Sequence, residues 1–296
     1  QLRREQFEAA LATLDALDKR FPAHTFQAQA AYYRGLLQLG QDQLKPGTTT
    51  LRAAAKNEEL PLSLRVNALR VSAVALREDD EDDAAFATLL ALEKLATRDA
   101  LTVPEKLWLG AQHVDRDQPR EALSYLEPMV EVNPAVTVPQ RSEALYHVGR
   151  ALTRMGEFEM GRQAFLQVLA LGRGFETKSR LALARSLASE QNYEEALAEY
   201  EALIPSETSA VAAEALYESG RIYGLVADER ARAGDEAGQR IADRESKKYY
   251  SRLTLLYGFP QLSPMPERAH LALYELTLRQ GEDNAAGGHL DDLIKG

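Results

Sequence analysis

The stretch Glu143–Val168, EALYHVGRALTRMGEFEMGRQAFLQV, predicts two amphipathic helices in succession. Apolar and small residues recur every three or four positions in each half, which places them on one face of a helix. They are Leu145, Val148, Gly149 and Leu152 in the first half, and Gly161, Phe165 and Val168 in the second. Gly156 separates the halves, since glycine is typical of the residue that follows a helix.

Two of these small residues predict how the helices pack. Gly149 and Gly161 fall where two antiparallel helices would cross. Because glycine has no side chain, it lets two backbones approach closely, and a bulky residue at either place would hold the helices apart. The stretch is therefore predicted to form a tightly packed helical hairpin.

The order of large, small and aromatic residues resembles the tetratricopeptide repeat, whose pattern is W-x2-L-G-x2-Y…A-x3-F…P. Leu145 stands at the Trp position and Gly161 at the Ala position of that pattern. The resemblance implies an all-α fold, a right-handed α-solenoid of antiparallel helix pairs. It also implies a protein that binds partners rather than an enzyme.

Equivalent small residues recur along the chain near the period of this family. Gly110, Gly149, Ala184 and Gly220 are separated by 39, 35 and 36 residues, against a period of about 34. The whole chain, 1–296, is therefore predicted to be one array of about six helix pairs. Its predicted parts are a leading single helix (1–22), degenerate repeats (23–97), well-matched repeats (104–223), a charged helical-hairpin insertion (227–244) and a terminal repeat (264–295).

Two breaks are predicted within the degenerate repeats. Lys45-Pro46-Gly47 predicts a turn between helices, with Thr48 or a neighbour as the cap of the next helix. The acidic run Glu78–Asp83 predicts a solvated loop whose last acids favour the N-terminus of the following helix. The other interpretation of this run is a divalent-cation site, although it lacks the alternating ligands and central glycine of a calcium loop.

Composition excludes some classes of partner. The chain has 35 basic and 45 acidic residues and a formal net charge of −10, which argues against nucleic acid, whose binders present a basic face. No apolar run approaches the roughly 20 residues that span a bilayer. The absence of cysteine excludes disulfides and thiolate metal sites. Linkers such as Phe21-Pro22 and Phe259-Pro260 resemble those of bacterial envelope lipoproteins and Tol-Pal-associated periplasmic proteins, which favours the periplasm or envelope over the cytoplasm.

No motif predicts catalysis, a cofactor or a metal. The histidines at 24, 113, 147, 270 and 289 are not spaced as metal ligands, and neither a phosphate-binding loop nor a nucleophile elbow is present. Gly172-Arg173-Gly174 is interpreted as a helix end and linker. Trp108 is interpreted as core or half-buried packing, with partner binding as the alternative.

The candidate partner site depends on the repeat register. In the family resembled, the first helix of each pair lines a concave groove, and the residue after the small Gly or Ala faces it. Three successive repeats place arginine at this position, and aromatic or aliphatic residues lie one turn earlier. The predicted partner-binding residues are Tyr146, Arg150, Arg154, Lys178, Arg185, Tyr217 and Arg221. Arginine suits carboxylates because its planar fork makes paired hydrogen bonds.

A structural role for the same arginines is the alternative. They would form ion pairs with Glu143, Glu214 and Glu218 on neighbouring helices and stabilise the array by a few tenths of a kcal/mol each. Family members that clamp acidic C-termini use Lys, Asn and Arg at such positions. Here the Asn residues are missing, so that particular specificity is not expected.

We therefore expect a non-catalytic scaffold whose groove binds an acidic or extended peptide segment of a partner protein. The first rival function is a structural subunit of a larger envelope assembly, docked through its ends and the charged hairpin. The second is an α/α-toroid enzyme working with paired carboxylates. Both ends look uncapped, since the first helix lacks a partner and the last presents Leu290, Leu293 and Ile294. This predicts either a segment of a longer protein or a homo- or hetero-oligomer formed through the ends.

Overall fold

The computed structural model describes residues 2–22, 24–131, 134–205, 209–257, 260–281 and 287–289. Within these ranges the secondary structure is helical throughout, and no strand occurs. None of the described helices combines the length and apolarity that crossing a membrane would need. The chain divides into two compact units, residues 1–116 and 117–296. One continuous array over both units stays a prediction.

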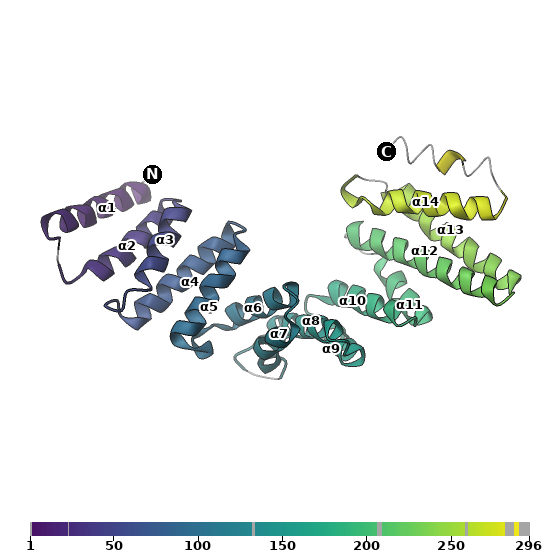
Figure 1. Cartoon of the computed structure of the whole chain (residues 1–296), viewed down its shortest axis with the longest axis horizontal. Helices are drawn as coiled ribbons and strands as arrows, with labels where there is room; N and C mark the ends of the chain where they lie inside the picture. The colour runs from purple at the N-terminus through teal and green to yellow at the C-terminus, as the bar shows by residue number, and fades with distance from the viewer. Residues whose placement is uncertain are drawn as a thin grey trace. The chain divides into compact units, whose positions relative to one another are not determined.

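The unit at residues 1–116 begins with a single helix followed by two antiparallel pairs (Figure 1). Its elements are α1 (Leu2–Arg20), α2 (Gln27–Gly40), α3 (Leu44–Ala54), α4 (Leu62–Glu78), α5 (Asp82–Ala96), the 3-10 turn η1 (Arg98–Ala100) and α6 (Val103–Asp115). α1 ends just before Phe21-Pro22, because proline disfavours the helical conformation in the residue before it. The acidic run lies at the predicted break, with Asp82 and Asp83 in the first turn of α5.

The predicted turn at Lys45-Pro46-Gly47 is wrong, because these residues form the first turn of α3. The N–H groups of a first helical turn have no partner within the helix, so Pro46 costs no hydrogen bond there. Gly47 is buried, and a Cβ on it would lie 2.7 Å from Leu39 of α2. Gly47 is therefore a packing glycine. Thr48 is also inside the helix and donates to the Leu44 carbonyl at 2.9 Å rather than capping an end.

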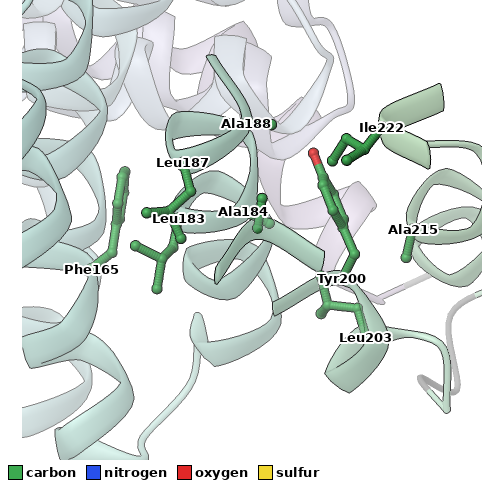
Figure 2. Close-up of a cluster of buried hydrophobic side chains, with 10 residues drawn as sticks. Phe165, Leu183, Ala184, Leu187, Ala188, Tyr200, Leu203, Ala215 and Ile222 are labelled. Carbon is green, nitrogen blue, oxygen red and sulfur yellow. The ribbon is translucent and has the colours of Figure 1, made fainter. Parts of the chain in front are cut away.

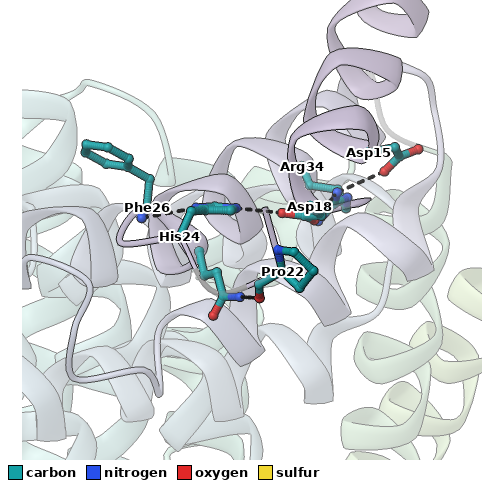
Figure 3. A network of polar contacts seen from close by, with 7 residues as sticks. Asp15, Asp18, Pro22, His24, Phe26 and Arg34 are labelled. Carbon is teal, nitrogen blue, oxygen red and sulfur yellow. Dashed lines mark hydrogen bonds and ion pairs between the residues drawn. The ribbon is translucent and has the colours of Figure 1, made fainter. Parts of the chain in front are cut away.

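A polar network joins α1 to α2 (Figure 3). Arg34 donates to Asp15 at 2.9 Å and to Asp18 at 2.8 Å. His24 Nδ1 accepts from the Phe26 backbone N–H at 3.2 Å, so its Nε2 carries the proton that it donates to Asp18 at 2.9 Å. The hydrogen bond from His24, followed by that from Arg34, lowers the pKa of Asp18. The network fixes the chain at the end of α1.

The unit at residues 117–296 contains the two longest helices among the described residues. Its elements are α7 (Pro119–Leu126), η2 (Glu127–Met129), α8 (Val138–Arg154), α9 (Phe158–Leu171), α10 (Glu176–Ser189), α11 (Tyr193–Leu203), α12 (Ser209–Arg232), α13 (Glu236–Tyr257), η3 (Pro260–Leu262) and α14 (Met265–Arg279). The halves of Glu143–Val168 lie in α8 and α9, as the periodicity predicts. α8 begins at a capping box in which Thr137 and Gln140 bond each other's backbone.

One turn conformation recurs between the helices of successive pairs. Gly156 has φ +81° between α8 and α9, the left-handed region that glycine reaches freely. The residues at the corresponding place after α2, α4, α6 and α10 are Asp42, Asp80, Asp117 and Gln191, with φ between 57° and 66°. Aspartate tolerates this region better than most residues. The separation predicted from Gly156 is thus confirmed, and several other turns use an acid at the same place.

α8 and α9 cross at their glycines, as predicted. A Cβ on Gly149 would lie 2.5 Å from the Phe165 ring, and one on Gly161 would lie 3.0 Å from the Gly149 carbonyl oxygen. Both distances are below ordinary van der Waals contact. Phe165 is almost fully buried and continues into the core formed with α10, α11 and α12 (Figure 2). There Tyr200 packs beside Ala184, in the place that Phe165 takes beside Gly149.

α12 and α13 pack on each other as a long antiparallel hairpin over the stretch 227–244, and the interpretation of that stretch as an insertion stays a prediction. The two helices have 24 and 22 residues, against 14 for α10, and turn at residues 233–235. Arg279 of α14 pairs with Asp228 at 3.0 Å and Asp243 at 3.2 Å, so α14 packs on the lengthened hairpin. The apolar residues predicted to leave the C-terminal end uncapped, at 290, 293 and 294, lie outside the described residues.

Candidate functional site

A groove of about 350 Å³ lies between α8 and α10. From α8 it takes residues on one helical face, at spacings of four, seven and eight, and from α10 it takes the face opposite. Phe165 of α9 forms part of its floor. The lining residues are Tyr146, Arg150, Thr153, Arg154, Phe165, Lys178, Leu181, Ala182, Arg185, Ser186 and Ser189. The groove thus has an apolar floor and basic walls.

Five of the predicted partner-binding residues line this groove, namely Tyr146, Arg150, Arg154, Lys178 and Arg185. Tyr146, Arg150 and Arg154 lie on α8, and Lys178 and Arg185 lie on α10. α8 and α10 are the first helices of successive helix pairs, so equivalent faces of the two helices border the groove. Their arrangement as one basic surface was expected from the register. Their role in binding a partner stays a prediction.

The α8 cations are held by groups near the groove. The Arg150 guanidinium lies 5.7 Å from the centroid of the Tyr146 ring, and its Nη1 lies 3.3 Å from His147 Nδ1. Arg154 pairs with the exposed Asp117 at 3.2 Å. An ion pair this exposed contributes little to stability and exchanges readily with an incoming carboxylate.

Lys178 is the most available of the groove cations. Its amine lies 5.1 Å from the centroid of the Phe175 ring, a cation–π contact. In the part of the chain that the structure describes, no carboxylate pairs with it, and its side chain is exposed. An acidic group of a partner would therefore meet an ammonium group that no described acid neutralises.

Phe175 was missed as a neighbour of the site. It caps α10 in a left-handed conformation, with φ 64°, which an aromatic residue rarely adopts. Its ring packs 5.3 Å from Tyr146 and 6.2 Å from His147 between centroids. These contacts hold the strained backbone and support Lys178 at the groove edge. The only signal in the sequence was its place after Gly172-Arg173-Gly174, where Gly172 forms the predicted left-handed helix end.

Arg185 and Arg221 form ion pairs with Glu214 and Glu218, two of the acids that a structural role for the arginines predicted. Arg185 Nε donates to Glu214 of α12 at 2.7 Å, across helices. Arg221 Nε donates to Glu218 at 2.7 Å, but these two residues lie on the same helix rather than on neighbouring ones. Burial lowers the pKa of Arg221, but its hydrogen bond to Glu218 and the charge of Glu218, with smaller contributions from Tyr200 and Tyr250, together outweigh burial and make the net shift upward.

Tyr200 lies beneath these two ion pairs. Burial raises the pKa of its hydroxyl, and the charges of Glu218 and Glu214 raise it further. Tyr217 and Arg221 do not line the groove between α8 and α10. They lie on α12, where the Tyr217 ring packs 5.9 Å from Tyr250.

Two other features considered from the sequence are a metal site and Trp108. Among the described residues, no group of three or more His, Asp or Glu side chains is placed to hold a metal ion. Trp108 is half-buried, and the Arg77 guanidinium lies 4.8 Å from its ring centroid.

Comparison with known proteins identifies the fold. No protein-family model and no curated protein matches the sequence. Among solved structures, the chain is similar to the C-terminal part of a TPR repeat-containing protein from Cytophaga hutchinsonii, at 15% identity and a TM-score of 0.54 over 90% of this chain and 95% of that one. It is also similar to RapI in its apo form, at 12% identity and a TM-score of 0.51 over 91% and 97% of the two chains.

A third similar structure is a signal-transduction ATPase from Pyrococcus horikoshii that carries a tetratricopeptide repeat sensor. The identity is 14% and the TM-score 0.51, over 99% of this chain and 46% of that one. At these identities the likeness concerns the fold. The chain has a tetratricopeptide-repeat-like fold, and the predicted class, an all-α solenoid of antiparallel helix pairs, is confirmed.

Proposed function

We propose that this protein is a non-catalytic interaction scaffold whose basic groove between α8 and α10 binds an acidic, extended peptide segment of a partner protein. The observation that carries the proposal is the convergence of Arg150, Arg154, Lys178 and Arg185 on one groove in a chain of net charge −10. Positive charge concentrated in one concave surface of an acidic protein selects negatively charged ligands.

The dimensions of the groove suit a short extended segment. From Tyr146 to Arg154 the axis of α8 advances by about 12 Å. An extended chain covers that length with about four residues. Such a segment would alternate its side chains between the basic walls and the floor at Leu181 and Ala182. Because exposed ion pairs contribute only about 0.2–1 kcal/mol each, the apolar floor is needed for useful affinity.

The ion pairs decide which substitutions test the proposal. Glutamate in place of Arg185 or Arg221 would face Glu214 or Glu218 and disturb the packing of α12, so loss of binding would be ambiguous. Lys178 has an exposed side chain, and Arg154 pairs only with an exposed acid among its described contacts. The variant Lys178→Glu/Arg154→Glu therefore changes the groove without loss of a buried contact.

The probe is a fluorescein-labelled peptide of about six residues that alternates Asp or Glu with Leu or Tyr. We expect fluorescence anisotropy to show binding to the wild type and at least about tenfold weaker binding to the variant, because two attractions become repulsions. Arg252→Glu/Arg268→Glu is the matched control, since both side chains are exposed, lie outside the groove and carry the same charge. Equal loss in the control, or equal binding of an Asn/Gln analogue of the peptide, would contradict the proposal.

The rival function, a structural subunit docked through the end of the array, has one observation in its favour. Leu255 and Leu256 near the end of α13 are 83% and 51% exposed, and Leu271 and Leu278 of α14 are 46% and 41% exposed. Leucines this exposed favour an interface. Analytical ultracentrifugation of the wild type and of Leu255→Asp tests this, since association that the substitution abolishes would support docking through α13.

A further inference from the structure

A second groove, of about 630 Å³, lies in the unit at residues 1–116. One wall is a face of α4 that extends from Asn67 to Glu78, and the other is the end of α2 with the start of α3. This groove belongs to neither the proposed basic site nor the core of the pairs. It includes the start of the acidic run, which the proposed function leaves unexplained.

The floor of this groove is aliphatic. Leu39 and Leu44 lie on one side and Val71 and Val74 on the other. The residues of α4 that pack into the core lie on another face of the helix, as the buried Leu69 and the buried Leu76 show. Val74 is 47% exposed. α4 therefore presents a second apolar face to the groove.

One end of the groove is strongly negative. Asp42, Glu78 and Asp79 line it with exposed side chains, and no cation pairs with them in the described parts of the chain. α2 ends at Gly40 and α4 at Glu78, so both helices direct their C-terminal carbonyl groups to this end. Because α3 begins at Leu44 and α5 at Asp82, helix N-termini lie beside these C-termini, so the three carboxylates are what favours a cation there.

The basic residue of the groove does not offset this charge. Arg70 Nε donates to Glu105 at 2.7 Å, and its Nη2 donates to the Ala100 carbonyl at 2.6 Å. Glu105 is buried, and its carboxylate forms an ion pair with Arg70 that neutralises the Arg70 charge. Asn67 is also occupied, since it donates to the Tyr32 hydroxyl at 2.6 Å. The charge left for a ligand is therefore negative.

The geometry points to a docking site for a basic, amphipathic segment of a partner protein. Its aliphatic side chains lie on Val71 and Val74, and a Lys or Arg beside them lies among Asp42, Glu78 and Asp79. This occupant is opposite in charge to the segment proposed for the α8–α10 groove. Charge complementarity decides the choice, because an acidic segment would face three carboxylates that no described cation neutralises.

The test uses the full chain and a panel of short fluorescein-labelled peptides. Each peptide has two leucines, at i,i+2 or i,i+4 spacing, next to a Lys-Arg pair, and each has a counterpart with Asp-Glu in that place. We expect a Lys-Arg peptide to bind equally to the wild type and to Lys178→Glu/Arg154→Glu, and its Asp-Glu counterpart not to bind to that variant, in which the basic groove between α8 and α10 is removed. Asp42→Asn/Glu78→Gln/Asp79→Asn should weaken binding about fivefold or more, since several exposed ion pairs are lost. These replacements keep the side-chain shapes, and asparagine tolerates the left-handed conformation of Asp42.

The matched control neutralises three exposed acids outside the groove, as Glu58→Gln/Glu59→Gln/Asp99→Asn. It should change binding by less than about twofold, because it alters only the distant field. Val74→Asn should weaken binding without loss of helicity, since it removes an apolar contact without adding charge and Val74 is 47% exposed. The inference is overturned if no Lys-Arg peptide outbinds its counterpart on Lys178→Glu/Arg154→Glu, if the control loses as much affinity as the groove variant, or if Lys178→Glu/Arg154→Glu alone abolishes the binding of the Lys-Arg peptide.

Discussion

Changing Gly149 to alanine adds one methyl group where α8 crosses α9. The new Cβ would lie 2.5 Å from one carbon of the Phe165 ring and 2.8 and 2.9 Å from two others. Phe165 is 1% exposed and lies in the core under the α8–α10 groove, so moving its ring away from the new methyl group would disturb its packing. Overpacking of this kind costs about 1–3 kcal/mol. Alanine also favours a helix over glycine by about 1 kcal/mol, so the net loss of stability should be about 0–2 kcal/mol.

Gly224→Ala is the control that separates these two effects. Gly224 lies inside α12, and the nearest atom to a Cβ on it is Ser246 Oγ, at 3.8 Å. This substitution gains helix propensity without crowding, so it should stabilise by up to about 1 kcal/mol. The difference between the two variants should therefore be about 1–3 kcal/mol, the overpacking cost alone.

Urea unfolding followed by circular dichroism gives the free energies of unfolding. Because repeat arrays unfold in more than one step, amide hydrogen exchange in α8 and α9 should accompany it. Phe165→Leu should reduce the cost of Gly149→Ala, since the contact is between these two residues. If Gly149→Ala stabilised the protein as much as Gly224→Ala, the crossing and the repeat register would both be refuted.

Two further predictions concern ion pairs that join helices. The pKa of Asp18 is lowered by His24 and then by Arg34, so its contribution is present above the unfolded value near 4 and is lost as pH falls through the folded pKa. The protection factors of the α1 amides, which correct for the intrinsic pH dependence of exchange, should fall as pH drops below about 4, by an amount worth about 0.5 kcal/mol for this partly exposed group, and Asp18→Asn should remove the dependence. Arg279→Met should cost about 1–2 kcal/mol in urea unfolding, because the buried Asp243 carboxylate loses its partner, and Asp243→Asn should restore most of the loss. Burial raises the pKa of Asp243, with Arg279 opposing the shift, so the stability of Arg279→Met should fall as pH rises through that pKa.

The helix pairs could be predicted because their signals are local. Spacings of three and four around Gly149, the break at Gly156 and the acidic break after Glu78 each depend on a few neighbouring residues. Lys45-Pro46-Gly47 was assigned wrongly because its composition suits both a turn and a helix start. What decided between them is a tertiary contact, the close approach of Gly47 to Leu39, which no local pattern contains.

The candidate site could be predicted as far as the register determines it. Tyr146, Arg150 and Arg154 share a helical face, so their common surface follows from spacing. The pairing of Arg185 with Glu214 depends on how α10 packs on α12. From the sequence, Arg185 could therefore equally be a partner-binding residue or part of an ion pair between helices. The support of Lys178 by Phe175 depends on a left-handed backbone conformation that aromatic residues seldom adopt.

Photo-crosslinking from inside the α8–α10 groove tests the central proposal most directly. Ser189 lines the groove and is exposed, so a benzoyl-phenylalanine there reports what occupies it. Leu166 of α9 is 44% exposed and does not line the groove, which makes it the matched position elsewhere in the same unit. We expect the acidic peptide to crosslink at position 189 and not at 166, and Lys178→Glu/Arg154→Glu to abolish the crosslink. Equal crosslinking at the two positions, or a crosslink at 189 that survives the charge reversal, would contradict binding of an acidic segment in this groove.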